Sequence, residues 1–391
     1  MTFYTIPSMK PLSLTLLVCA LLVHLTSGAM VSAIERVETR GNVHEQILSG
    51  RVLVEAADGG LLLESPNQEL HLIEPTEIAK RSQDKTPYKR LDGDELAEEL
   101  LAELPLGFQV HQSKNYTIAF NTTRSYAKWC SSLLERLNKG FLGYWGKLDA
   151  DITPPADPLV VIIFSDQQSY ARYAAKELGP AVGSVIGYYS ITSNRVLMYD
   201  LTGNQAIARE RNSRGSMHQI TAALSSPAAA PQVATIIHEA THQIAYNCGL
   251  QTRLADNPRW LSEGIALYCE TPDLSSRGWR GIGKVNGPRW NQFRADYQSG
   301  KTLSLERMLT DDKLLADPQT AATAYAQAWA WNYYLIRHHR KQFVAYLEQL
   351  ASKGQLVWDT PEQRLADFRK HFGEDEESLT ADFYRQMSRI K

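Results

Sequence analysis

Hydrophobic and polar positions follow two different rhythms along the chain. Up to about residue 199, apolar residues gather in short alternating or continuous runs separated by turn residues, and these runs predict β-strands. Beyond residue 230, apolar positions recur at spacings of three and four, which predicts amphipathic helices. A mixed sheet subdomain followed by a mainly helical subdomain is typical of an α+β fold, with a functional cleft at the junction.

The first strand-like runs form a region of their own, residues 34–79. Asp58-Gly59 and Pro66-Asn67 separate these runs and are typical turn sequences. We therefore expect a small antiparallel β module. Structural packing, substrate docking and a pro-segment are all compatible roles for it. The runs are residues 50–55, 60–64 and 69–73.

Residues 80–94 are charged and poor in apolar side chains, which predicts a linker. The remaining residues, 95–391, are expected to form the main domain. Its expected strands are residues 116–120, 159–164, 185–189 and 195–199. Its expected helices before residue 230 are residues 96–104, 125–137 and 167–178.

The N-terminus carries a pattern typical of a secretory signal peptide, which we place at residues 1–29 with a second cleavage position after Ala33. Leu12–Leu25 is an apolar run too short to span a bilayer comfortably, and small residues follow it. We expect export to the periplasm, the cell surface or the medium, with no stable membrane insertion after the signal is removed. A retained N-terminal anchor is the alternative.

Length and charge narrow the class of protein further. A chain of 391 residues can bury a sizeable core in two or three domains. Its net charge is −2, so neither nucleic acid nor an anionic membrane surface is indicated as a partner. The oligomeric state is not predicted by these features.

The sequence His238-Glu239-Ala240-Thr241-His242 carries the clearest chemistry. Residues 231–246 have helical periodicity, with a proline suited to the first turn. On a helix, histidines four residues apart lie one turn above each other and can bind one metal ion. Glu239 then lies beside the metal, where it can take a proton from a metal-bound water.

A third ligand is expected at Glu263, in a second short helix that begins near Pro258. Two imidazoles and one carboxylate leave the fourth position of a tetrahedral Zn²⁺ open for water, which is the pattern of catalytic zinc sites. The predicted metal ligands are therefore His238, His242 and Glu263, holding one Zn²⁺ per chain.

Three cysteines remain after the signal peptide, an odd number that does not describe a disulfide framework. Cys248 and Cys269 each lie six residues after a predicted ligand. If the two ligand helices are antiparallel, these positions lie about 18 Å apart, so we expect no disulfide between them.

These residues resemble those of the gluzincin metallopeptidases of the thermolysin and aminopeptidase type, and Trp260-Leu261-Ser262-Glu263-Gly264 is similar to their WLxEG motif. Residues 96–335 resemble, more closely still, an uncharacterised family of exported bacterial peptidase-like proteins. The resemblance implies a zincin fold with one zinc ion. It also implies hydrolysis of peptide or protein substrates, with Glu239 as the general base.

Two departures limit what the resemblance implies. Thermolysin-type enzymes place an aspartate four residues after the third ligand, where this chain has Leu267, so the group that orients the histidines is not predicted. The GxMEN stretch that binds a free amine in aminopeptidases is also missing, because Gly215-Ser216-Met217 continues with His218-Gln219. Endopeptidase action is therefore favoured over aminopeptidase action.

Tyr325 lies close to where aminopeptidase-like gluzincins carry the tyrosine that stabilises the transition state, so the resemblance implies that catalytic role for it. A buried core tyrosine is the alternative. Tyr268 and His338 are the other candidates. Residues 195–199 are compatible both with an open sheet edge that pairs with substrate and with an interior strand.

A second class of function also fits the sequence. The chain could be a non-catalytic cell-envelope binding protein that retains a zinc site and works through its β module. Glu239 discriminates between the two, because a binding module needs no general base beside the metal.

Overall fold

The computed structural model describes residues 33–40, 46–203, 216–273 and 279–390. It confirms a mixed α+β fold, about 50% helix and 18% strand, with an antiparallel and a mixed sheet. The described residues form two compact units: one comprises those before Pro105 with Ser190–Asn194, and the other comprises the rest. The expected signal peptide lies outside the described residues. Among those that are described, no helix has both the length and the hydrophobicity needed to cross a bilayer.

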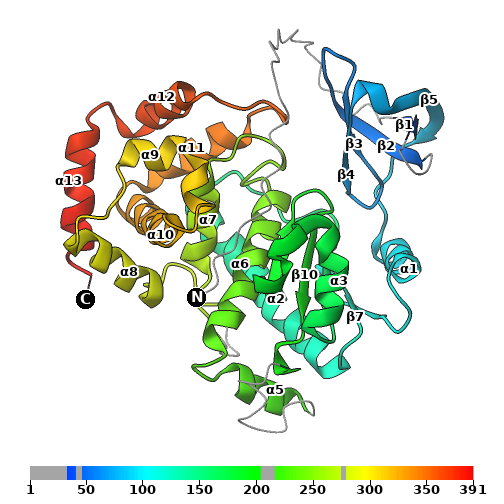
Figure 1. Cartoon of the computed structure of the whole chain (residues 1–391), viewed down its shortest axis with the longest axis horizontal. Helices are drawn as coiled ribbons and strands as arrows, with labels where there is room; N and C mark the ends of the chain where they lie inside the picture. The colour runs from blue at the N-terminus through cyan, green and yellow to red at the C-terminus, as the bar shows by residue number, and fades with distance from the viewer. Residues whose placement is uncertain (1–32, 41–45, 204–215, 274–278, 391) are drawn as a thin grey trace. The chain divides into compact units, whose positions relative to one another are not determined.

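The N-terminal unit contains the predicted antiparallel module as a five-stranded sheet (Figure 1). Its strand order is β4-β3-β2-β1-β5, and each neighbouring pair is antiparallel. A small core of Val37, Leu61, Leu63 and Ile73 packs on it. The elements are β1 (Ala33–Thr39), β2 (Gln46–Glu55), β3 (Leu61–Glu64), β4 (Leu70–Ile73), η1 (Pro75–Glu77), β5 (Ile78–Pro87) and α1 (Gly93–Glu103).

The prediction of a linker over residues 80–94 is wrong for most of that stretch. Strand β5 continues to Pro87, and Asp92 already caps helix α1. The charged composition is explained by the position of β5 at the edge of the sheet, where most of its side chains are exposed. Arg81 of this strand forms an ion pair with Glu35 of β1. The charged residues of this stretch therefore belong to an edge strand and not to a linker. The N-terminal unit extends beyond residue 79, where the β module was expected to end.

The larger unit begins with the mixed sheet, in the order β6-β7-β8-β10-β9. Strands β7, β8 and β10 are parallel, and β6 is antiparallel to β7. Strand β10 is therefore interior and β9 lies at the edge, which resolves the two alternatives for residues 195–199. The strands are β6 (Gln109–Gln112), β7 (Tyr116–Phe120), β8 (Leu159–Phe164), β9 (Gly187–Ser190) and β10 (Arg195–Tyr199).

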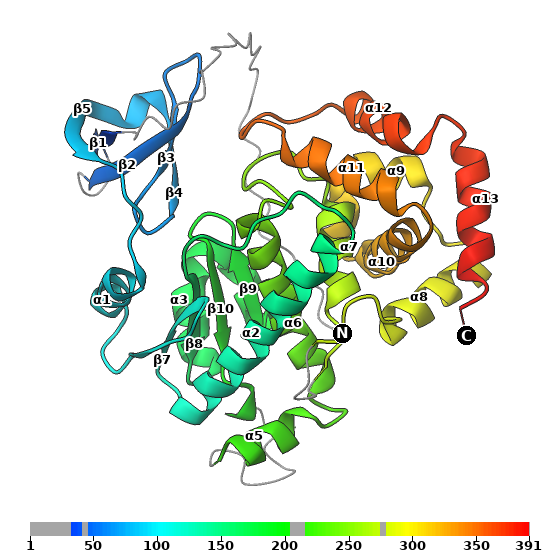
Figure 2. The ribbon, with the colours of Figure 1, turned by 180° about the vertical axis from the view of Figure 1, so that it is seen from behind.

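Helices cover this sheet. Helix α3 packs against β8 and β10, while α2 and α6 pack against each other and against strands of the sheet (Figure 2). The residues of β7, β8 and β10 are all buried, as their continuous apolar runs predict. The helical elements here are α2 (Arg124–Gly146), α3 (Gln167–Leu178), η2 (Gly179–Ser184), η3 (Leu201–Gly203) and α5 (Met217–Leu224).

From α6 onward the described chain is helical, as the periodicity predicts. Helix α10 is buried along most of its length and packs against α7, α8, α11 and α13 (Figure 1). The elements are α6 (Ala230–Asn247), α7 (Arg259–Cys269), α8 (Gly287–Gln298), α9 (Leu305–Thr310), η4 (Asp312–Leu315), α10 (Ala321–His338), α11 (Arg340–Ala351), α12 (Pro361–Phe372) and α13 (Glu376–Met387).

Helices α7 and α10 approach closely at Gly264. A Cβ atom there would lie 1.8 Å from Asn332 Nδ2 and 2.7 Å from the carbonyl oxygen of Ala328. The buried Asn332 amide donates to the carbonyl oxygens of Trp260, at 3.1 Å, and Ala328, at 2.9 Å. Only glycine leaves room for this contact, which fixes α7 beside α10.

Glu64 stabilises the N-terminal unit from within. Its buried carboxylate accepts hydrogen bonds from Arg51 Nε at 2.7 Å, Arg90 Nη2 at 2.9 Å and the Tyr88 hydroxyl at 3.0 Å. Burial raises the pKa of Glu64, but the charges of Arg90 and Arg51 outweigh burial and hold the pKa below its ordinary value. The charged form is therefore the stable one in the folded unit.

We predict that Glu64→Gln lowers the free energy of unfolding of this unit by about 2 kcal/mol at neutral pH, because hydrogen bonds to a charged group are lost. Amide hydrogen exchange in β3 and β4 measures this, with the exposed Glu98→Gln as the control. Since the folded-state pKa is depressed, the stabilisation is complete above the ordinary value of 4.5 and is lost as pH falls through the folded-state pKa. Equal exchange in the two variants would contradict the prediction.

Candidate metal centre

Helix α6 carries the two histidines and Glu239 as predicted. The helix begins at Ala230 with Pro231 in its first turn, and its segment from Thr235 to Ala245 is buried throughout. The imidazoles of His238 and His242 lie one turn apart, with ring centroids 4.9 Å from each other and an interplanar angle of 78°. Their Nε2 atoms are 3.2 Å apart, so both present the same ring nitrogen to one point.

Helix α7 brings Glu263 to that point. Its Oε2 atom lies 3.1 Å from His238 Nε2 and 3.9 Å from His242 Nε2. The ligand atoms of these three buried residues all lie within 4.8 Å of one another, so the group could hold a metal ion. Two imidazole nitrogens with one carboxylate oxygen are a donor set suited to a divalent transition metal. The predicted ligand residues are therefore brought together.

Hydrogen bonds within this buried cluster stabilise the charged forms of Glu263 and His238. Burial raises the pKa of Glu263, but hydrogen bonds from His238 and His242 hold it well below its ordinary value. Burial lowers the pKa of His238, whereas hydrogen bonds to Glu263 and Glu270 raise it to about 10. The two carboxylates thus favour the protonated form of His238, and binding of a metal ion at its Nε2 atom would require that proton to leave.

Glu270, which follows the last residue of α7, is the residue that the sequence reasoning missed. Its Oε2 atom lies 2.9 Å from His238 Nδ1, and its Oε1 atom accepts a hydrogen bond from Asn286 Nδ2 at 2.7 Å. It therefore orients His238 in place of the aspartate expected at Leu267. Glu270 lies seven residues after Glu263, two helical turns along the same face. This spacing is the sequence feature from which its place near the site could have been predicted.

The carboxylate of Glu239 is held at the edge of the mixed sheet. Its Oε2 atom accepts a hydrogen bond from the backbone N–H of Tyr189 in β9, at 2.8 Å. Burial raises the pKa of Glu239 and exceeds the opposing effect of the two histidines and of this hydrogen bond. The edge strand thus positions Glu239 beside the ligand cluster. Nothing in the local sequence indicates this contact.

Tyr325 of α10 is buried within the electrostatic reach of the cluster. Burial raises its pKa well above the ordinary value, and the carboxylates of Glu263 and Glu239 add to that effect, so its hydroxyl keeps its proton. The guanidinium of Arg289 lies over its ring, 5.4 Å from the centroid. Tyr325 is therefore buried, as the core alternative expects, and its hydroxyl is subject to the charges of Glu263 and Glu239.

The other two candidates for the catalytic donor have partners elsewhere. The hydroxyl of Tyr268 lies 2.7 Å from that of Tyr144, in an aromatic cluster. The ring of His338 packs against Tyr334, with centroids 5.4 Å apart. All described cysteines, Cys130, Cys248 and Cys269, are buried and free, which confirms the expected absence of a bridge between the last two.

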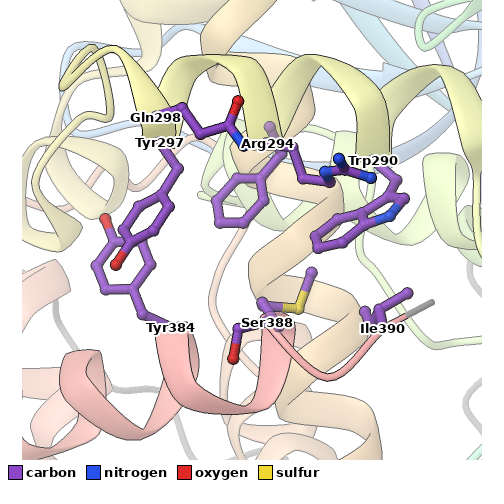
Figure 3. A pocket seen from close by; sticks show the side chains of 9 residues that line it. Trp290, Arg294, Tyr297, Gln298, Tyr384, Ser388 and Ile390 are labelled. Carbon is purple, nitrogen blue, oxygen red and sulfur yellow. The ribbon is translucent and has the colours of Figure 1, made fainter.

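A cavity of about 350 Å³ lies between α8 and the C-terminal end of α13 (Figure 3). Its lining includes Trp290, Arg294 and Tyr297 from α8 and Tyr384 from α13. None of the predicted ligands lines it. Arg289, the neighbour of Trp290, instead contacts the ring of Tyr325 near the metal cluster. The cavity is therefore not the candidate metal centre.

Comparison with known families matches residues 232–356 to a family described as a protein of unknown function (DUF1570). The matched segment contains His238, Glu239, His242 and Glu263, together with Tyr325. A search of curated proteins found no match. The match covers about a third of the chain and carries no described activity.

We predict that Glu270→Gln weakens binding of a divalent metal about 10- to 100-fold, because the charge that orients His238 is lost. Competition with a chromophoric chelator measures this affinity, and the exposed Glu377→Gln on α13 is the matched control. Unchanged affinity in Glu270→Gln would show that Glu270 does not support the metal site.

Proposed function

We propose that this chain is an exported zinc-dependent peptidase that cleaves peptide or protein substrates, with endopeptidase action favoured over aminopeptidase action. One observation carries the proposal: Glu239 is buried on the same helix as His238 and His242, and its carboxylate is subject to the charges of His238, His242 and Glu263. A site that only stores or displays a metal needs no carboxylate that can exchange protons next to it. The apolar run Leu12–Leu25 supports export of the chain.

The donor set supports zinc as the metal. Two histidines and one glutamate are a ligand set of catalytic zinc sites, whereas closed structural sites use four protein ligands and mostly cysteine. The three described cysteines are free and stand outside the ligand group. When bound at these residues, zinc would supply a Lewis acid that activates water and polarises the carbonyl of the scissile bond.

Glu239 is the proposed general base. Its carboxylate takes a proton from the attacking water and passes it to the nitrogen of the leaving amine, so one residue serves both proton transfers. Its raised pKa supports this role, because the base must hold the proton until the peptide bond breaks. The hydrogen bond from Tyr189 N–H keeps one carboxylate oxygen in place and leaves the other to exchange the proton.

Tyr325 is the proposed donor to the oxygen on which negative charge develops. A tyrosine can act this way only if its hydroxyl is protonated, and the raised pKa of Tyr325 ensures this near neutral pH. The electrostatic effect of Glu263 and Glu239 on this hydroxyl supports the role. Arg289 on its ring limits the directions in which the side chain can turn.

We predict that Glu239→Gln retains one zinc ion per chain but cleaves a peptide library about 100- to 10,000-fold more slowly, because only the general base is removed. Metal analysis and a mass-spectrometric cleavage assay are the two measurements. His242→Ala is the contrasting variant, since it should lose both zinc and cleavage.

Equal cleavage by wild type and Glu239→Gln would reject the peptidase and leave the metal site standing. Zinc binding without any cleavage by the wild type would favour the alternative, a cell-envelope binding protein that retains the metal.

We predict that Tyr325→Phe lowers kcat about 100-fold while zinc content and KM change little, because the lost hydrogen bond forms only as charge develops. Steady-state kinetics on one cleaved peptide measures this. Tyr268→Phe removes a buried hydroxyl that bonds Tyr144 and serves as the control. A fall in thermal stability with unchanged kcat would assign Tyr325 to the core.

A further inference from the structure

Arg259 occupies a position on α7 that points to substrate recognition. It lies four residues before Glu263, one helical turn away and on the same face of the helix. Its backbone N–H donates to Asp312 Oδ1 at 2.8 Å, so the main chain at this position is fixed. The side chain therefore starts from a fixed point one helical turn before Glu263.

The guanidinium of Arg259 has an unsatisfied edge. Its Nε and Nη2 atoms are shielded from solvent and have no hydrogen-bond partner among the described residues. A buried cation without a partner is costly, and proteins normally pair such a group. The residue as a whole is only partly buried, and binding of a ligand to this edge would require the side chain to turn toward its exposed side.

Arg364 shows which group the Nε and Nη2 atoms of an arginine can bind in this chain. Arg364 donates from Nε to Asp256 Oδ2 at 2.9 Å and from Nη2 to Asp256 Oδ1 at 2.5 Å. Two parallel N–H groups match the two oxygens of one carboxylate, which neither an ammonium nor a single donor does. Arg259 leaves the equivalent pair of donors available.

Two tyrosines are influenced electrostatically by both Arg259 and Glu263. Burial raises the pKa of Tyr246 to about 12, with the charge of Glu263 raising it further and that of Arg259 opposing it. Tyr325 responds to the same two charges. The charges of Arg259 and Glu263 thus act on the same two hydroxyls. Arg289, by contrast, has the ring of Tyr325 and the carboxylate of Glu270 as neighbours.

We propose that Arg259 binds a carboxylate of the substrate through its Nε and Nη2 atoms. This inference rests on the proposed peptidase function, for which it defines a substrate class. In a peptide the carboxylate has two sources: the free C-terminus, or the side chain of an aspartate or glutamate near the scissile bond. Either source places an anion one helical turn from Glu263.

The test measures binding to the full chain supplied with zinc and carrying Glu239→Gln, so that bound peptide is not cleaved. Four probes separate the sources of the carboxylate. They are N-acetyl-trialanine with a free C-terminus, its C-terminal amide, N-acetyl-Ala-Glu-Ala amide and N-acetyl-Ala-Gln-Ala amide. Calorimetric titration is carried out with Arg259 intact, with Arg259→Gln, with Arg259→Lys and with the exposed control Arg172→Gln.

We expect at least one carboxylate probe to bind about 10- to 100-fold more tightly than its neutral counterpart, the range that paired hydrogen bonds to a charged group supply. Arg259→Gln should abolish this preference by weakening only the carboxylate probe. Arg259→Lys should keep part of it, and Arg172→Gln all of it. Preference for the free C-terminus identifies terminal recognition, and preference for glutamate identifies an acidic residue in the substrate.

A readout independent of ligand separates recognition from a structural role. Removing an unpaired buried charge should leave the Tm of Arg259→Gln unchanged or higher, whereas loss of a structural ion pair would lower it. Equal binding of charged and neutral probes, no binding of any probe, or a preference that survives Arg259→Gln overturns the inference.

Cleavage of the same four peptides by the wild-type chain tests the proposed peptidase separately. An Arg259-dependent preference without cleavage of any peptide would reject the peptidase and keep the carboxylate site. Equal cleavage of the charged and neutral peptides would support the peptidase and reject the carboxylate site.

Discussion

The buried hydrogen-bond chain from Glu270 through His238 to Glu263 is the interaction on which the candidate site depends. The three polar side chains are largely shielded from solvent. Burial of each one costs less free energy because the next one forms a hydrogen bond with it. The chain joins α6 to the middle of α7 and to the residue that follows its end, and Asn286 joins it to α8. The site is therefore also a polar connection between helices, and its geometry is shared with the packing of the helical half.

Backbone packing sets the precision of this arrangement. Gly264 lets α7 lie against α10 closely enough for Asn332 to bond the α7 backbone, and Glu263 is its direct neighbour. Tyr325 belongs to the same α10 helix, so one packing contact fixes the distance between a proposed ligand and a proposed donor. Helix positions of this kind hold functional side chains more accurately than loops do.

The sheet contributes through its edge. Strand β9 directs the N–H of Tyr189 at Glu239, while the interior strand β10 separates that edge from the rest of the sheet. Arg259 shows the opposite situation, because its donors have no acceptor among the described residues. The backbone thus satisfies the carboxylate of Glu239, whereas the guanidinium of Arg259 has two donors that a bound anion could satisfy. This contrast marks where the fold is complete and where a ligand would complete it.

By itself, the sequence determined the features that depend on local periodicity and spacing. The helix around His238, the two histidines one turn apart and the choice of Glu263 as the third member of a possible metal-binding group follow from it, as do strands β7, β8 and β10. Tertiary structure alone decided which strand lies at an edge, and so why the charged stretch of β5 is a strand. It also decided that Glu270 and Tyr189 serve the site, because such contacts depend on how helix ends and sheet edges meet across sequence separations of 32 and 50 residues.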